Sequence, residues 1–302
     1  MEQRLKDKSE NILVFGCSGL LGKCLIENYA IKKKIHVFLN KTKIINKKLN
    51  FVSRNKFSLL KNYINKNNIK TIINFAGLTN IESCEANKKL SYQSNYILPI
   101  KLAKLAKKTN TDYVFISTDN FEFNSKKMSE KHNSKPLNNY GIHKRQSEKD
   151  ILDIYSKSLI IRTNFYCIGN KNRKSFSDTI LKTIKSNNEI GLFRDVYYTP
   201  IYGKYLLKYM FSLIGKKKYG IYNISSNEKI TKLNFGHKIC DIFLLNKTLI
   251  KATHLKKNKK LVRRPFNMAL DNNKLKKVLK IKIPSMRRQL IVMKNDFRLL
   301  KK

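Results

Sequence analysis

The sequence predicts an α/β protein built on a doubly wound parallel sheet. Short apolar strands alternate with helical stretches along the chain, at the spacing of strand–helix–strand units. The first strand ends in a glycine-rich turn that leads straight into a helix. Strands joined through helices pair in parallel and are covered on both faces, so these observations favour one sheet between two layers of helices.

The glycine-rich turn lies within residues 11–25 and indicates a phosphate site. Gly16 can make the turn with a positive φ, Gly19 lets the backbone approach a pyrophosphate, and Gly22 lets the helix pack against the strand. The first amides of the helix have no internal partner and lie at the positive end of its dipole. A plain turn between a core strand and a core helix is the alternative interpretation.

The second predicted strand, residues 35–39, is followed by residues that bear on the choice of cofactor. In a unit that binds NAD, an Asp or Glu at this place binds the adenosine ribose. This chain has Asn40 and Lys41 instead, with Lys43 two residues later. Because no acid repels a 2′-phosphate there and two lysines can bind one, we expect NADPH to be favoured over NADH.

The first half of the chain continues the same alternation. Small residues from Ala76 to Thr79 follow a buried strand and leave room for a cofactor to pass close. The expected strands are residues 12–15, 35–39, 49–52, 71–75 and 113–116, and the expected helices are residues 57–67 and 97 to about 108.

Candidate catalytic residues lie at and beyond the end of the strand at residues 113–116. Thr118 follows this strand at the carboxyl edge, where such sheets bind ligands. Tyr140 and Lys144 open a helix and, being four residues apart, share one of its faces. A phenol has a pKa of about 10, and a nearby ammonium favours the phenolate, so this pair suits proton transfer, with Thr118 adding a hydrogen bond to the reacting oxygen. Tyr140 as a plain core residue is the alternative.

The second half of the chain is also mixed in structure. The expected strands are residues 158–162 and 220–224, and the expected helices are residues 174–185, 201–213, 231–243 and 283–293.

These motifs together resemble the extended short-chain dehydrogenase/reductases, and within them the dTDP-4-dehydrorhamnose reductase-like group. The resemblance covers nearly the whole chain. In chain order it rests on Gly16-x-x-Gly19-x-x-Gly22, residues 74–79 (NFAGLT), Asn95, residues 116–119 (ISTD), Pro136, Tyr140, Lys144, Arg162-Thr163, Thr199-Pro200 and Arg264-Pro265.

The resemblance implies a Rossmann-type domain, residues 1–162, that binds NADP or NAD. It implies a smaller, discontinuous substrate-binding domain within residues 163–302, some segments of which return to the first domain. The implied reaction is reduction of a 4-keto nucleotide sugar in the synthesis of a deoxysugar for surface polysaccharide. By the pattern of the group, Tyr140 donates the proton, Lys144 binds the nicotinamide ribose and lowers the tyrosine pKa, and Thr118 orients the carbonyl.

Two sets of site residues follow from the turn, the strand ends and the resemblance. The expected cofactor residues are Gly16, Ser18, Gly19, Leu20, Leu21, Gly22, Asn40, Lys41, Phe75, Ala76, Gly77, Thr79, Asn95, Tyr140 and Lys144. The expected substrate residues are Thr118, Asp119, Asn120, Asn164, Phe165 and Arg264.

The chain departs from the group at two of these substrate positions. Asn120 stands where the group usually has Tyr, and Asn164-Phe165 stands where a Trp is usual. These departures leave the sugar open. The basic stretch at residues 251–264 is expected either to meet a diphosphate or to be a solvated loop.

Two other functions remain open at the level of sequence. One is a nucleotide-sugar epimerase of the same superfamily, which would hold NAD tightly and consume no reductant. Residues 162–164 (RTN) vaguely match an epimerase pattern. The other is a non-catalytic, NADP-binding regulatory subunit, against which the intact Tyr140 and Lys144 pair argues mildly.

Composition narrows the class of protein further. The five cysteines are scattered and show neither metal-ligand spacing nor a disulfide framework, so no metal is expected. No apolar run is long enough to span a bilayer, and the N-terminus is polar, which favours a cytoplasmic location. A homodimer is one assembly that the sequence leaves open.

The formal net charge of +44 is the unusual feature of the composition. Lysine is spread over the whole chain beside abundant Asn and Ile, as an AT-rich genome would encode, and no nucleic-acid motif is present. The charge is therefore interpreted mainly as a solvated lysine surface, with no specific nucleic-acid partner.

Any binding of DNA or RNA is accordingly predicted to be weak and independent of sequence. Affinity should fall steeply with salt, because phosphate contacts release counterions. Fluorescence anisotropy over a salt series checks this, and nanomolar, sequence-selective binding at physiological salt would contradict it.

Overall fold

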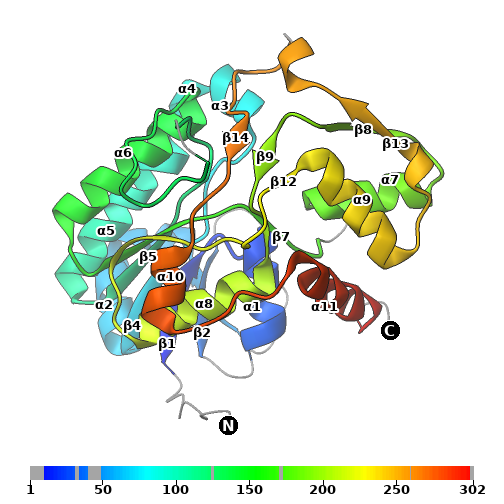
Figure 1. The fold of residues 1–302 in the computed structure, drawn as a ribbon. Helices are drawn as coiled ribbons and strands as arrows, with labels where there is room; N and C mark the ends of the chain where they lie inside the picture. Colours follow the sequence, from blue (N-terminus) through cyan, green and yellow to red (C-terminus); the bar gives the residue numbers. More distant parts are fainter. Residues whose placement is uncertain are drawn as a thin grey trace.

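The centre of the molecule is a parallel β-sheet. The computed structural model describes residues 10–30, 34–39, 49–123, 126–169, 173–258 and 260–299. Within them seven strands pair in the order β11-β6-β5-β4-β1-β2-β3, every pair parallel, which confirms the predicted α/β fold class (Figure 1). Their bounds are β1 (Asn11–Phe15), β2 (Ile35–Leu39), β3 (Asn50–Ser53), β4 (Ile69–Asn74), β5 (Asp112–Ile116), β6 (Ser158–Arg162) and β11 (Gly220–Asn223).

The strand order reverses next to β1, which pairs with β2 on one side and with β4 on the other. Successive connections leave the sheet in opposite directions at such a point, and a crevice opens outside the carboxyl ends of the two strands. The loops that follow β1 and β4 meet there, since the Phe75 amide donates a hydrogen bond of 2.9 Å to the Phe15 carbonyl. The sheet therefore places the glycine-rich turn at its topological switch point.

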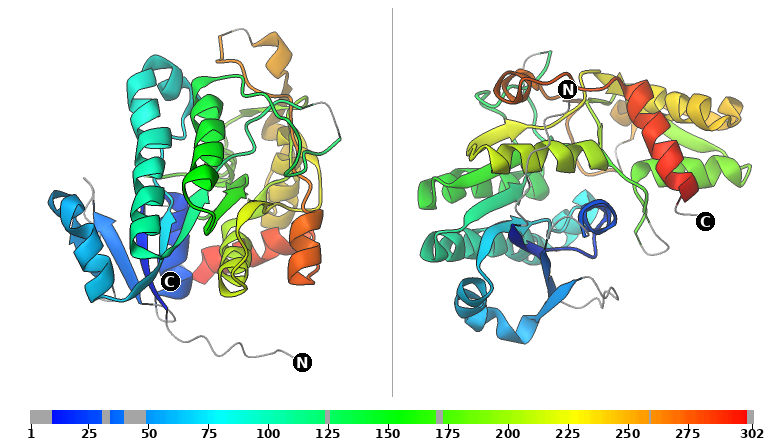
Figure 2. Two further views of the ribbon diagram at one scale, coloured as in Figure 1. Left: turned by 90° about the vertical axis from the view of Figure 1, so that its left-hand side faces the viewer. Right: turned by 90° about the horizontal axis from the view of Figure 1, so that it is seen from below.

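Helices cover both faces of the sheet. One core cluster joins the sheet to α1 (Leu20–Tyr29), α8 (Gly203–Gly215) and α10 (Asn273–Leu279). A second cluster joins the opposite face to α2 (Leu60–Lys66), α5 (Leu98–Thr109) and α6 (Asn139–Ile154). Figure 2 shows α5 and α6 side by side along the sheet. The strands are apolar on both faces because both are buried.

The link between β4 and α5 is more helical than expected. It consists of α3 (Ile81–Ala86), α4 (Lys88–Tyr92) and a π-helical turn, η2 (Gln93–Ile97), which runs directly into α5. Single π turns within helices occur often at functional sites, because they turn a side chain out of the regular register. The helix predicted from residue 97 is therefore the last part of a longer helical segment.

The second half of the chain builds a separate core beside the sheet. Its helices α7 (Phe176–Lys185), α9 (Lys232–Phe243) and α11 (Met286–Leu299) enclose a second apolar cluster (Figure 1). Its short strands pair as β10-β7, β12-β9-β14 and β13-β8. Their bounds are β7 (Phe165–Tyr166), β8 (Ile190–Phe193), β9 (Tyr197–Tyr198), β10 (Ile201–Tyr202), β12 (Ile230–Thr231), β13 (Ile250–Thr253) and β14 (Asn267–Met268).

Several predicted helices begin later in the structure. The helices predicted at residues 174–185 and 283–293 begin at Phe176 and Met286, as α7 and α11, and α11 continues to Leu299. Residues 201–202 form β10, which pairs in parallel with β7, and α8 begins only at Gly203. Residues 54–59 form a 3-10 turn, η1 (Arg54–Leu59), before α2. Short 3-10 turns also form η3 (Lys247–Leu249) and η4 (Leu255–Lys257). The division of the chain at residue 162 stays a prediction.

None of the described helices combines the length and the apolar character that crossing a bilayer requires.

A buried ion pair fixes α6 against the sheet. Arg162, at the end of β6, donates to the Glu148 carboxylate through Nε at 2.9 Å and through Nη2 at 2.7 Å. The Ser117 hydroxyl donates to the same carboxylate at 2.6 Å. Glu148 and Arg162 are fully buried, and Arg145 pairs with Glu148 from the rim of the cluster. Because Glu148 lies one turn after Lys144, this cluster sets the rotation of the helix that carries Lys144.

Replacing Arg162 with Met should destabilise the protein strongly. The substitution leaves the Glu148 carboxylate buried without its two-point partner, a change that typically costs about 3–5 kcal/mol. Urea denaturation measures the free energy of unfolding. Lys204→Met is the control, because it breaks a partly exposed pair with Asp296, for which about 0–1 kcal/mol is typical. Equal losses in the two variants would show that the buried pair has no such role.

Candidate functional site

The glycine-rich turn has no room for side chains at two of its glycines. Gly16 has a φ of +84°, and a Cβ built on it would lie 2.5 Å from the Ala76 nitrogen. A Cβ on Gly22 would lie 2.3 Å from the Cα of Cys17. Gly19 closes the turn, since its amide donates to the Gly16 carbonyl at 3.0 Å. The turn thus seats α1 tightly on the end of β1 and leaves bare backbone at the start of the helix.

The start of α1 fits an anionic group. Gly19 is the N-cap residue, no side chain caps the helix, and the first turn contains no acidic residue. The first backbone amides of a helix lack intrahelical acceptors and lie at the positive end of its dipole, so they can bind phosphate oxygens. The Leu21 side chain is buried in the core, so this residue can offer only its backbone, whereas Ser18 and Leu20 are partly exposed. These residues fit the pyrophosphate of a dinucleotide.

The loop after β4 lies against Lys144 and is held by Asn95. The Asn95 side chain donates to the Leu78 carbonyl at 2.9 Å and accepts from the Leu78 amide at 3.2 Å. A Cβ on Gly77 would lie 2.8 Å from the Asn95 side-chain oxygen and 3.6 Å from the Lys144 Nζ. Asn95 is fully buried, and its two hydrogen bonds support this loop.

The other expected cofactor residues differ in how exposed they are. Phe75 and Ala76 are partly buried beside the turn, and Thr79 is exposed. Asn40 and Lys41 lie outside the described residues.

Lys144 is buried with its ammonium tied to the sheet. The α6 helix begins where the Asn138 side chain accepts from the Gly141 amide at 2.9 Å, so Tyr140 lies in its first turn. The Lys144 Nζ donates to the Ile116 carbonyl at 2.8 Å and lies 4.5 Å from the centre of the Phe115 ring. Burial lowers the pKa of Lys144 to about 8, and the Glu148 carboxylate opposes this shift.

Tyr140 lies beside Thr118 at the end of β5. Burial raises the pKa of Tyr140 to about 12, hydrogen bonding with the Thr118 side chain opposes the rise, and the Asp119 charge adds to it. The pKa of Tyr140 is thus raised, opposite to the lowering expected from Lys144, which is not among the groups that shift it. The phenol is therefore protonated at neutral pH. A protonated, buried phenol next to a hydroxyl is suited to donate a proton to an oxygen atom of a ligand.

The residues after Thr118 are all buried at the carboxyl edge of the sheet. The Asn120 side chain accepts from the Asn138 Nδ2 at 2.9 Å, so Asn120 is tied to the residue that caps α6. Among the described residues the Asp119 Oδ2 has no hydrogen-bond partner. Burial raises the pKa of Asp119 to about 7, while the Lys232 charge and the Asn164 side chain oppose the shift.

The second half of the chain reaches this edge through several segments. Arg264 pairs with Glu82 of α3, and Asn164 interacts with Asp119. The Phe165 side chain packs against the core of the sheet instead. Lys232 and Tyr198 were not expected at the site, yet Lys232 faces Asp119. In a chain with 64 lysine and arginine residues, one functional lysine has no distinguishing signal.

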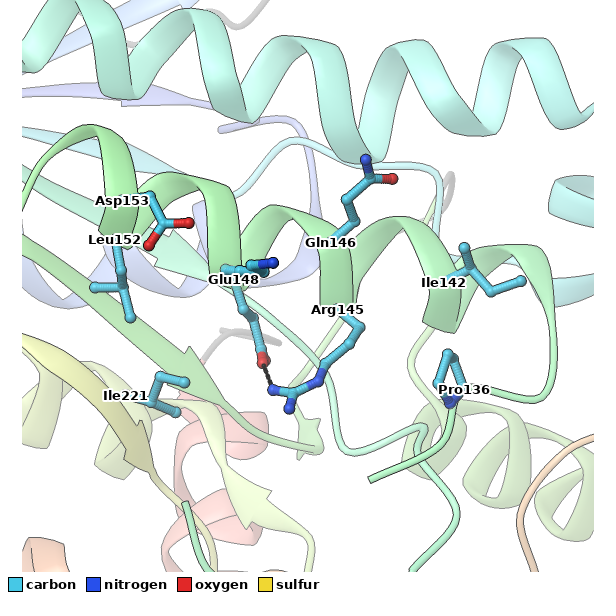
Figure 3. A pocket seen from close by; sticks show the side chains of 9 residues that line it. Pro136, Ile142, Arg145, Gln146, Glu148, Leu152, Asp153 and Ile221 are labelled. Carbon is cyan, nitrogen blue, oxygen red and sulfur yellow. Dashed lines mark hydrogen bonds and ion pairs between the residues drawn. The ribbon is translucent and has the colours of Figure 1, made fainter. Parts of the chain in front are cut away.

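A cavity on the described part of the chain lies away from these residues. It measures about 520 Å³ and opens along the outer side of α6, where Figure 3 shows Arg145 and Glu148 near Ile221 of β11. None of the site residues expected from the sequence lines it. Within the described ranges no group of His, Cys, Asp and Glu side chains could hold a metal ion.

Comparison with known proteins now identifies the family. The model of the RmlD substrate binding domain matches residues 10–299. The chain belongs to this family. The resemblance that the motifs indicate is thereby confirmed.

Individual relatives of the family are similar over most of the chain. A dTDP-4-dehydrorhamnose reductase of Aggregatibacter actinomycetemcomitans is 26% identical over 288 residues, 89% of this chain and 93% of that protein. A probable low-salt glycan biosynthesis reductase of Haloferax volcanii is 24% identical over 67% of this chain and 69% of that protein.

A solved structure supports the fold. The crystal structure of dTDP-4-dehydrorhamnose reductase from Bacillus anthracis, in complex with NADP, has a TM-score of 0.80 at 23% identity. It covers 95% of this chain and 99% of that one. This likeness shows that the two chains share their fold.

Replacing Gly19 with Asp should abolish dinucleotide binding while the protein stays folded. Asp is a favoured N-cap residue, so α1 should survive, but its carboxylate would occupy and repel the place of a phosphate. Calorimetry with NADPH measures the loss. Gly215→Asp is the control, because a Cβ there meets nothing within 4 Å. Wild-type affinity in a folded Gly19→Asp protein would show that the turn is only structural.

Proposed function

We propose that this chain is an NADPH-dependent reductase that converts the ketone of a 4-keto nucleotide sugar to an alcohol. The observation that carries the proposal is the meeting of Tyr140, Thr118 and Lys144 at the carboxyl edge of the sheet, beside the bare N-terminus of α1. A proton donor, a hydrogen-bonding hydroxyl and a cation thus lie next to a dinucleotide site. The first substrate to test is dTDP-4-dehydrorhamnose, from the name of the relative that matches 89% of the chain.

The side chains of the site have distinct parts in this reaction. When bound, NADPH supplies a hydride, and the first amides of α1 and the loop at residues 75–79 would hold it. Tyr140 keeps its phenolic proton at neutral pH and delivers it to the carbonyl oxygen of the substrate. Thr118 hydrogen bonds to the same oxygen and aligns it with the phenol. Lys144 brings a positive charge that favours the phenolate left behind.

Burial of the site supports this chemistry. Thr118, Tyr140 and Lys144 are each at most 9% exposed. Hydrogen bonds and charges act more strongly in such an environment than in water, and fixed donors need no reorganisation during the reaction. The Ile116 carbonyl and the Phe115 ring hold the Lys144 ammonium in place before any ligand arrives.

The similar proteins favour a reductase over an epimerase or a regulatory subunit. Those described above are named reductases, whereas an epimerase or a regulatory subunit rests on weaker sequence features. We further propose that residues 163–302 supply most of the substrate side of the site. A cytoplasmic location, a homodimer and the lack of a specific nucleic-acid partner stay predictions.

Replacing Tyr140 with Phe should lower kcat by about 10²–10⁴-fold, the usual contribution of general acid catalysis. Only a hydroxyl is lost, so folding and NADPH affinity should remain, and the effect should appear mainly in kcat. NADPH oxidation with the keto nucleotide sugar measures the rate. Thr118→Ala should cost less, because a neutral donor is removed. Lys144→Met should reduce both kcat and NADPH affinity.

Tyr219→Phe is the matched control for the loss of a phenol. Its hydroxyl bonds to Asp112 at the opposite end of β5, far from the carboxyl edge. Its kcat should equal the wild-type value. Wild-type turnover by Tyr140→Phe would refute the mechanism and favour the regulatory interpretation.

A further inference from the structure

Lys232 is fixed at the site by the start of α9. Its Nζ lies 3.5 Å from the centre of the Tyr198 ring and 4.9 Å from that of Phe176. Its backbone amide donates to the Val196 carbonyl at 3.1 Å, and the preceding Thr231 caps the helix. The aromatic faces hold the ammonium by cation–π attraction, so the position of Lys232 is set before any ligand binds.

Two polar atoms next to Lys232 lack partners. The Asp119 Oδ2 and the Tyr198 hydroxyl are buried, and neither has a hydrogen-bond partner among the described residues. Asp119 is 3% exposed and Tyr198 is 1% exposed. Buried polar groups in folded proteins are almost always hydrogen-bonded, so two adjacent exceptions need an explanation. Polar groups of a bound ligand would provide it.

Asp119 connects this cluster to the catalytic tyrosine. Asp119 follows β5, and its charge acts on Tyr140 of α6, on Tyr198 of β9 and on Lys232 of α9. Lys144 and the glycine-rich turn are the parts that would hold the cofactor, whereas Lys232 and Tyr198 come from the second half of the chain. The cluster therefore lies on the substrate side of Tyr140.

We propose that Lys232, Asp119 and Tyr198 form a subsite for the hydroxyl groups of the sugar ring of the substrate. This inference rests on the proposed function and names the part of the nucleotide sugar that is recognised. A hydroxyl both donates and accepts, so the ammonium can donate to its oxygen while the Asp119 carboxylate accepts its hydrogen. Hydrogen bonds with a charged partner are about twice as strong as neutral ones.

The same cluster is unsuited to the diphosphate of the substrate. Asp119 lies among its members, and the charge of a nearby phosphate would disfavour its ionised form. The charge of Arg264 also acts on Lys232, but Arg264 is paired with Glu82. The neutral, hydroxyl-rich ring is the part of a nucleotide sugar that matches a cation and an anion side by side.

Binding of a non-reacting nucleotide sugar tests the subsite without turnover. The probe is dTDP-glucose, which has a hydroxyl in place of the ketone, and dTDP alone serves as the ligand without a sugar. Calorimetry on the NADPH-loaded protein should show that Lys232→Met raises the Kd for dTDP-glucose by about 10- to 100-fold, the value of one charge-assisted hydrogen bond. The Kd values for dTDP and NADPH should change by less than about threefold.

Two further variants complete the experiment. Tyr198→Phe removes only a hydroxyl and should weaken dTDP-glucose binding by about 2- to 10-fold, which keeps the proposal falsifiable if Lys232→Met does not fold. Lys229→Met is the matched control. Its ammonium lies 4.8 Å from the ring centre of the exposed Tyr197, close in sequence but outside the cluster. This control should bind dTDP-glucose like the wild type.

The outcomes separate the possible roles of the cluster. Equal weakening of dTDP and dTDP-glucose in Lys232→Met would assign the lysine to the diphosphate and overturn the subsite. Unchanged affinities in Lys232→Met and Tyr198→Phe would leave the cluster a merely structural role and also overturn it. The expected binding pattern in a protein that reduces no keto sugar would support the subsite and contradict the proposed reductase function.

Discussion

The site depends on the buried ion pair between Glu148 and Arg162. Tyr140, Lys144 and Glu148 follow one another at intervals of one turn on the same face of α6. Arg162, at the end of β6, forms an ion pair with the Glu148 carboxylate. The hydroxyl of Ser117, directly after β5, donates a hydrogen bond to the same carboxylate. Two neighbouring strands thereby dictate how α6 is rotated. Most of the helix is polar or charged, so apolar packing alone would define that rotation poorly.

Features set by neighbours in the chain could be predicted from the sequence. The glycine spacing requires a tight turn between β1 and α1, and the four-residue interval places Tyr140 and Lys144 on one helix face. Apolar patterning also locates the sheet strands within a few residues. At residues 201–213 the same patterning is ambiguous, because a continuous apolar run does not distinguish a strand from a helix. Parallel pairing with β7, which is distant in sequence, makes residues 201–202 a strand.

Features set by distant contacts could not be predicted. Lys232 meets Asp119 across more than a hundred residues of chain, and nothing in its local sequence separates it from the other lysines. The resemblance places Asn95 among the cofactor residues, but its two hydrogen bonds to Leu78, 17 residues away, cannot be read from the sequence. Acidic residues indicate the position of the candidate site better than basic residues do in this chain. Only 20 residues are acidic, and Glu82, Asp119 and Glu148 all lie around one edge of the sheet.

Elements from both halves of the chain pack against the central sheet. Helices α8 and α10 and strand β11 come from beyond residue 162, yet they complete one face and one edge of the sheet. A fragment ending at residue 162 would expose that apolar face to water and leave the β6 edge unpaired, which invites aggregation. Residues 1–162 are therefore not a portable module. Exchange of residues 163–302 between relatives would have to preserve these three elements, so a new specificity is more easily reached by changing loops and single side chains.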